Sequence, residues 1–104
     1  MTFRPTPPSV QIDVKGFELT SALQETIVKK LQRSLSHTDK IISVHVILKI
    51  EKHSTQLAHV TVALPGTTIN AQAQSEDMYK TIDLLADNLQ AQLAKHKEKI
   101  KHHD

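Results

Sequence analysis

Three consecutive segments of the sequence alternate between apolar and polar residues, and this pattern constrains the fold more than any other feature. The segments are 44–50, 58–64 and 69–73, and in each of them every second residue is aliphatic or alanine. A period of two residues is typical of a strand with one buried face and one exposed face. The connections are short, and Pro65-Gly66 is typical of a tight turn. We therefore predict an antiparallel meander of three strands with one buried face.

A further strand and two helices complete the predicted order of elements. Residues 10–14 alternate in the same way up to Gly16, which predicts a first strand. Aliphatic residues recur with helical spacing in 23–35 and again in 82–100, which predicts two amphipathic helices. The order β-α-β-β-β-α indicates an α+β fold whose first β-α-β unit is a parallel crossover. Two helices packed on one face would cover the apolar side of a four-stranded sheet.

The predicted helix starts carry capping signals. Thr20 or Ser21 can cap the first helix, and Ser21 with Gln24 has the spacing of a capping box. Ser75 is the expected N-cap of the second helix, because two acidic residues follow it and favour the positive end of the helix dipole.

The length and composition favour a single soluble domain. A chain of 104 residues suits one compact domain, which we assign to residues 10–104. Residues 1–9 contain three prolines and no apolar period, so we expect a flexible N-terminal arm. The absence of cysteine excludes disulfides and thiolate metal sites. Neither a signal peptide nor an apolar run of about 20 residues is present, so we expect a cytoplasmic protein without a membrane partner.

The charged residues are unevenly distributed along the chain. Lys and Arg number 13 against 11 Asp and Glu, and a net charge of +2 does not by itself imply nucleic acid. Basic residues nevertheless gather on both predicted helices and could join into one basic stripe, the footprint expected for a duplex or rRNA backbone. The alternative is a solvated helix end that the dipole favours. The candidate residues for contact with nucleic-acid phosphates are Lys29, Lys30, Arg33, Lys80, Lys95, Lys97, Lys99 and Lys101.

The histidines and carboxylates do not have the spacing of a metal or catalytic site. Asp83 and Asp87 form an i, i+4 pair, which on a helix surface is usually solvated. His45 and His59 are expected on the polar face of the sheet, and His96 in the apolar stripe of its helix. No HExxH-type motif is present, and two glycines cannot build a phosphate-binding loop. We expect no enzymatic activity, no metal, no cofactor and no small-molecule substrate.

Four segments of the chain resemble the bacterial hibernation-promoting and ribosome-associated inhibitor proteins, the sigma-54 modulation protein family. They read VQIDVKG at 10–16, DKIISVHVILKIEK at 39–52, DMYKTID at 77–83 and QLAKHKEK at 92–99. The D-M-Y-x-x-I-D stretch followed by Q-L-x-K-H-K is the most specific part. The resemblance covers residues 10–103 with the segments in the same order.

The resemblance implies a fold akin to a double-stranded-RNA-binding domain and a place on the small ribosomal subunit, between its head and body. There the family overlaps the mRNA path and the A- and P-site tRNA anticodons, and holds ribosomes inactive in stationary phase. Tyr79 matches a family hallmark, either as a base contact or as a core or boundary aromatic under the sheet. Basic positions of the family match Lys30, Arg33, Lys80, Lys95, Lys97, Lys99 and Lys101. The resemblance therefore implies that the basic residues of the two helices bind rRNA phosphates.

The resemblance also implies the short form of the family, because the sequence ends at Asp104, directly after the second helix. The short form promotes pairing of inactive ribosomes together with ribosome modulation factor. Asn88 and Ala91 stand where relatives often carry basic residues, so we expect a shallower salt dependence of binding than in those relatives. Two other functions fit the same residues: a duplex-RNA-binding module acting away from the ribosome, and a protein-interaction domain without an RNA partner.

Overall fold

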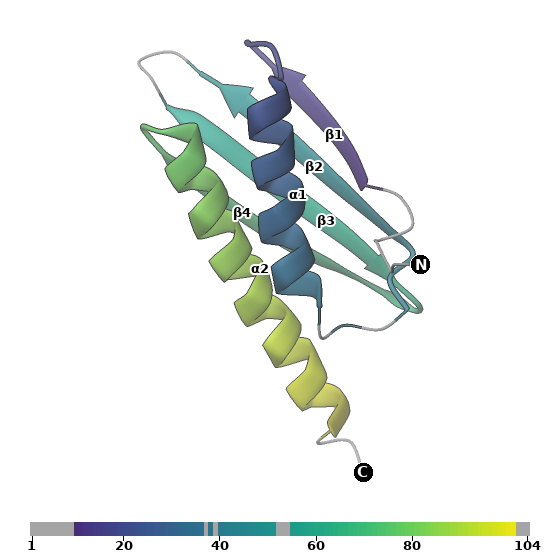
Figure 1. Ribbon diagram of the computed structural model, residues 1–104. Coiled ribbons are helices and arrows are strands. Elements are labelled where there is room, and N and C mark those ends of the chain that lie inside the picture. Colours follow the sequence, from purple (N-terminus) through teal and green to yellow (C-terminus); the bar gives the residue numbers. More distant parts are fainter. Residues whose placement is uncertain (1–9, 37, 39, 52–54, 102–104) are drawn as a thin grey trace.

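The computed structural model describes residues 10–36, 38, 40–51 and 55–101, with side chains described up to Lys97. The element order is the predicted β-α-β-β-β-α (Figure 1). The elements are β1 (Val10–Lys15), α1 (Ser21–Leu35), β2 (Ser43–Ile50), β3 (Gln56–Leu64), β4 (Thr67–Ser75) and α2 (Met78–Lys101). The predicted arm, residues 1–9, lies outside the described residues.

The four strands form one sheet in the order β1-β2-β3-β4. β1 pairs with β2 in parallel, which confirms the crossover, and the other two pairings are antiparallel, which confirms the meander. Both helices lie on the same face of this sheet, giving two layers (Figure 1). β4 is an edge strand that pairs only with β3 among the described residues.

The alternation predicted for the strands is confirmed by their burial. Val44, Val46 and Leu48 of β2 face the helices and are buried, and the residues between them are more exposed. Every second residue of β3 from Ala58 to Leu64 is buried in the same way. This burial of one face stabilises the sheet, since each large aliphatic side chain contributes roughly 1.5–3 kcal/mol when removed from water. The core is aliphatic, as the scarcity of aromatic residues predicts.

The two helices run parallel to each other, a relation that the topology dictates. β1, β2 and β4 point in the same direction, and each helix returns from the end of a strand with that direction (Figure 1). A buried hydrogen bond joins the helices, because the Ser34 hydroxyl of α1 donates to the Ala86 carbonyl of α2 at 3.1 Å. α2 is the longer helix, and its C-terminal turns extend past the sheet (Figure 1).

The first helix is capped by Thr20, one of the two predicted residues. Its hydroxyl accepts a hydrogen bond from the backbone N–H of Leu23 at 3.1 Å. Ser21 is already the first helical residue, so the predicted capping box of Ser21 with Gln24 is wrong. The backbone N–H of Gln24 instead donates to the Thr20 carbonyl, the first hydrogen bond of the helix itself.

The predicted N-cap of the second helix is also wrong. Asp77 caps α2, since its carboxylate accepts from the backbone N–H of Tyr79 at 3.2 Å. Ser75 ends β4, and its hydroxyl lies 2.6 Å from the hydroxyl of the fully buried Thr81. Thr81 also donates toward the Gln56 carbonyl of β3 at 3.1 Å, which ties the start of α2 to the sheet.

Two glycines have positive φ angles at connections between elements. Gly16 follows β1 with φ 90°, and a Cβ placed there would lie 2.9 Å from the carbonyl oxygen of Ile50. Gly66, in the predicted turn after Pro65, has φ 79° and open space around it. Within the described ranges, no helix is long and apolar enough to cross a membrane.

Candidate nucleic-acid interface

The C-terminal part of α2 carries the densest group of predicted phosphate-binding residues. Lys95 and Lys97 are exposed, and the helix continues to Lys101. Lys99 and Lys101 are helical, but their side chains lie outside the described part. Because residues two apart on a helix point about 200° apart, Lys95 and Lys97 lie on different flanks of α2. This end of the helix can therefore contact anionic groups on more than one side.

The flanks of α2 are identified by two side-chain contacts. Asn88 donates to the Gln72 carbonyl of β4 at 2.8 Å, so its flank lies above the edge of the sheet. Lys95 is seven residues further, or two turns, and shares this flank. Asp83 instead contacts α1. Lys97 follows Asp83 by about four helical turns and therefore lies close to the same flank. Lys80 is exposed on α2, four turns before Lys95.

The three basic residues of α1 do not have the same surroundings. Lys29 and Arg33 are exposed and lie one turn apart. Lys30 is partly buried, and its Nζ lies 2.7 Å from Asp83 Oδ1 of α2. The sequence pattern predicts a solvated Asp83 and does not indicate this ion pair. The parallel direction of the helices follows from the strand order, and it would have indicated that Lys30 and Asp83 can lie side by side.

Tyr79 lies outside the core. Its exposed fraction is 46%, so a core position under the sheet is wrong, and a boundary position stays a prediction. It precedes Asp83 by one helical turn and shares its flank, which faces α1. The predicted base contact stays a prediction, but the exposed ring is available for one.

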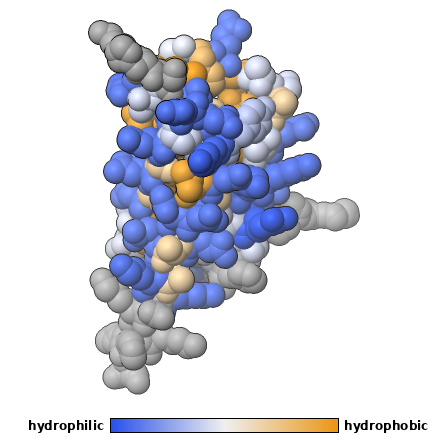
Figure 2. Space-filling view, turned by 90° about the vertical axis from the view of Figure 1, so that its left-hand side faces the viewer, coloured by the Kyte–Doolittle hydropathy of each residue, from blue (hydrophilic) through white to orange (hydrophobic). Residues whose placement is uncertain are grey.

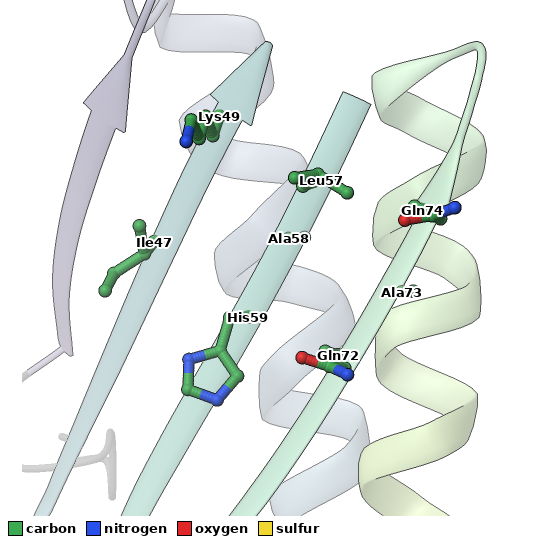
Figure 3. Close-up of a pocket in the computed structure, with 8 residues that line it drawn as sticks. All are labelled: Ile47, Lys49, Leu57, Ala58, His59, Gln72, Ala73 and Gln74. Carbon is green, nitrogen blue, oxygen red and sulfur yellow. The ribbon is translucent and has the colours of Figure 1, made fainter. Parts of the chain in front are cut away.

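The opposite face of the sheet is polar and carries a shallow hollow (Figure 3). His59 of β3 projects there, and His45 of β2 lies 2.7 Å from Asp13 of β1, as expected for the polar face. His96 is half-buried on its helix, also as expected. The hollow is lined by Ile47, Lys49, Leu57, Ala58, His59, Gln72, Ala73 and Gln74. Amides and aliphatic groups dominate this lining, so it offers few charges to a phosphate backbone.

Neither face offers a metal site in the part that the structure describes. Among these residues, no three His, Asp or Glu side chains lie close enough to hold a metal ion.

Figure 2 shows the side of the molecule formed by α2 and the β4 edge, which is mostly hydrophilic with small apolar spots. The arrangement therefore suits a charged, hydrated partner along the helices better than an apolar ligand.

Comparison with known proteins gives consistent results in sequence and structure. Residues 10–101 match the family described as sigma 54 modulation protein / S30EA ribosomal protein. The ribosome hibernation promoting factor of Pseudomonas putida KT2440 is 46% identical over 92 residues, with 86% of this chain and 89% of the relative covered. The factor of the same name from Escherichia coli K12 is 40% identical over 96 residues, with 90% and 100% covered.

Two solved structures share the fold. A ribosomal subunit interface protein from Coxiella burnetii superposes with a TM-score of 0.81 at 43% identity, covering 86% of this chain and 98% of that one. The N-terminal domain of Protein Y from Thermus thermophilus gives a TM-score of 0.74 at 25% identity, covering 83% and 94%. The likeness to a double-stranded-RNA-binding domain stays a prediction.

Proposed function

The chain belongs to the sigma 54 modulation protein / S30EA ribosomal protein family, and on this premise we propose that it is a ribosome hibernation factor that binds the small ribosomal subunit. The observation that carries the proposal is the match to hibernation promoting factors along 89% and 100% of their own length. The family is one of ribosome-associated factors and not of enzymes, so binding is the proposed activity.

The basic residues of the two helices are the proposed contacts with rRNA. Lys29 and Arg33 are exposed on α1, and Lys95 and Lys97 are exposed on α2. Each lysine or arginine that neutralises a phosphate releases counterions, which gives affinity without base sequence specificity. Exposed side chains can do this without loss of core packing. Lys30, Lys80, Lys99 and Lys101 complete the proposed set.

The proposed place of binding is the channel between the head and body of the small subunit. A protein in this channel occupies the mRNA path and the A- and P-site anticodon positions, so it blocks translation by exclusion. The proposed setting is the cytoplasm of cells in stationary phase. There the factor would promote inactive ribosome dimers together with ribosome modulation factor acting on the same ribosomes.

Co-sedimentation with purified small subunits tests this function. The protein is added to subunits with and without bound mRNA and initiator tRNA, and the pelleted fraction is measured. We expect binding to bare subunits and displacement by mRNA and tRNA, because both would occupy the same channel. Binding that ignores mRNA and tRNA would contradict the proposed place.

A plain RNA duplex separates the proposal from a duplex-RNA module that acts away from the ribosome. If the duplex competes at the same concentration as free small subunits, the module is the better description. Binding that shows no dependence on salt would instead point to a protein-interaction domain.

A further inference from the structure

An exposed aromatic ring and an exposed ion pair lie on the side of α2 that faces α1. Tyr79 is 46% exposed, and the side chains of Lys30 and Asp83 are 40% and 54% exposed. Asp83 reaches Lys30, so its flank of α2 faces α1, and Tyr79 lies one turn earlier on the same flank. The phenol hydroxyl of Tyr79 makes no hydrogen bond within the described residues.

The ion pair presents a defined order of hydrogen-bonding groups. Lys30 Nζ is a donor, and it lies 2.7 Å from Oδ1 of Asp83, whose two carboxylate oxygens are acceptors. The order is therefore donor, acceptor, acceptor. The Watson–Crick edge of cytosine has the same order, with its amino group, N3 and O2. The base that complements this order is guanine, through its O6 acceptor and its N1–H and N2–H donors.

We propose that Tyr79, Lys30 and Asp83 form a binding site for an unpaired guanine of RNA, a site that rests on the proposed binding to rRNA. The Tyr79 ring stacks on the base. Asp83 accepts from N1–H and N2–H of the base, and Lys30 donates to O6. Unpaired bases in RNA are commonly held in this way, by stacking on an aromatic side chain and hydrogen bonding of the Watson–Crick edge.

The other three bases fit the same groups less well. Adenine and cytosine place an amino donor against Lys30 and a ring nitrogen acceptor against Asp83, so both contacts are repulsive. Uracil matches at O4 and N3–H, but its O2 acceptor meets the second carboxylate oxygen. Stacking on Tyr79 is available to every base and selects none of them. The selectivity therefore comes from the ion pair.

Exposed cations next to the ion pair suit the phosphates that flank such a base. Lys29 is the chain neighbour of Lys30, and Arg33 is three residues further on α1. Both are exposed, so they can contact the phosphates of the RNA backbone while the base lies against Tyr79 and the ion pair.

Base ranking with short RNA tests the site directly. The probes are the fluorescently labelled pentamers UUGUU, UUAUU, UUCUU and UUUUU, and binding is followed by fluorescence anisotropy at fixed salt. We expect UUGUU to bind at least about tenfold more tightly than UUAUU, as specific base-edge contacts give. This ranking needs only the unsubstituted protein. Equal affinity for the four pentamers, or no binding to any of them, would overturn the site.

Single substitutions assign the selectivity to these residues. Asp83→Asn should reduce the preference for UUGUU to less than about twofold, because one acceptor becomes a donor. Asp87→Asn removes the same charge one turn further on and should keep the preference. Tyr79→Ala should weaken all four pentamers by about tenfold, while Tyr79→Phe keeps the stacking and the affinity. A preference that survives Asp83→Asn would overturn the proposed base contact.

Co-sedimentation with small subunits, run in parallel, separates this site from the proposed function. Subunit binding that mRNA and tRNA displace, combined with no preference among pentamers, would contradict the guanine site alone. A guanine preference that depends on Asp83, without subunit binding, would support the site and contradict the ribosomal function.

Discussion

Lys30 of α1 and Asp83 of α2 form an ion pair across the two parallel helices, with Nζ 2.7 Å from Oδ1. Both side chains are substantially exposed, at 40% and 54%. The pair compensates one charge of the basic surface of α1, so the uncompensated cations there are Lys29 and Arg33 among the described residues. Its contribution to the free energy of unfolding can be compared with that of the buried hydrogen bond between Ser34 and Ala86 of the same two helices.

Lys30→Met should lower the free energy of unfolding by less than about 1 kcal/mol, and the effect should shrink at high salt. The reason is that water screens an exposed pair. Ser34→Ala removes the buried hydrogen bond to the Ala86 carbonyl and should cost about 1 kcal/mol at every salt concentration. Urea unfolding at two salt concentrations measures both. A large, salt-independent loss in Lys30→Met would contradict this.

Replacement of Lys95 and Lys97 together by alanine should weaken binding to small subunits about tenfold or more and flatten its salt dependence. Two lost phosphate contacts reduce the slope of log K against log salt by about 1.5. The matched control is Lys15→Ala with Lys49→Ala, which removes two charges from neighbouring residues on the opposite face of the sheet. A salt titration of binding compares the two. Equal losses in both variants would argue for a diffuse charge effect.

Gly16→Ala should destabilise the protein more than Gly66→Ala. Both positions have positive φ, which costs a residue with a Cβ about 1 kcal/mol or more. At Gly16 the added methyl also meets the Ile50 carbonyl oxygen at 2.9 Å, and this oxygen belongs to the backbone. Gly66 has open space, so only the backbone cost applies. Thermal unfolding of the two variants gives the comparison, and equal losses would mean that β2 yields at Ile50.

Thr20→Ala should cost about 1 kcal/mol, while Ser21→Ala should have little effect. The Thr20 hydroxyl accepts from Leu23 N–H, whereas Ser21 is the exposed first residue of the helix. Urea unfolding distinguishes the two residues that sequence alone left as alternatives. A greater loss for Ser21→Ala would assign the cap to Ser21.

Thr81→Val should cost about 1–3 kcal/mol, although it preserves the shape of the side chain. The Thr81 hydroxyl is fully buried and lies between oxygens of Ser75, Asp77 and Gln56. Thr26→Val is the matched control, because among the described residues its exposed hydroxyl donates only to the Ala22 carbonyl within α1. A calorimetric melt of each variant gives the difference. Similar midpoints for the two would show that water replaces the lost contacts at Thr81.

Much of the fold was predictable because the sheet buries one face only. In β2 and β3 the side chains alternate strictly between the core and the polar face, so the sequence itself records the strand and its orientation. The family resemblance is confirmed by the match over residues 10–101. Ile100 was also expected in the buried stripe of α2, but its side chain lies outside the described part.

The errors arose where polar side chains serve tertiary contacts. Ser75 has the chemistry of an N-cap, but its hydroxyl pairs with Thr81, and the carboxylate of Asp77 caps the helix instead. Thr81 was not expected in the core, because a hydroxyl is buried only when partners surround it. Its partners are Asp77 and Ser75, four and six residues before it, and the Gln56 carbonyl of β3, which is 25 residues away. The pairing of Lys30 with Asp83 depends in the same way on the packing of two helices.

The projection of α2 past the sheet separates selection for stability, which acts on the buried part of the helix, from selection for charge, which acts on its exposed end. Leu93 is the last buried residue of this helix in the described part, and the residues up to Lys97 are exposed or half-buried. Substitutions at exposed positions usually change stability by no more than about 0.5 kcal/mol. Mutation can therefore tune the proposed affinity of the lysine-rich end for rRNA without bringing the domain closer to unfolding. Homologues can drift in charge at this end over evolutionary time while their shared scaffold persists.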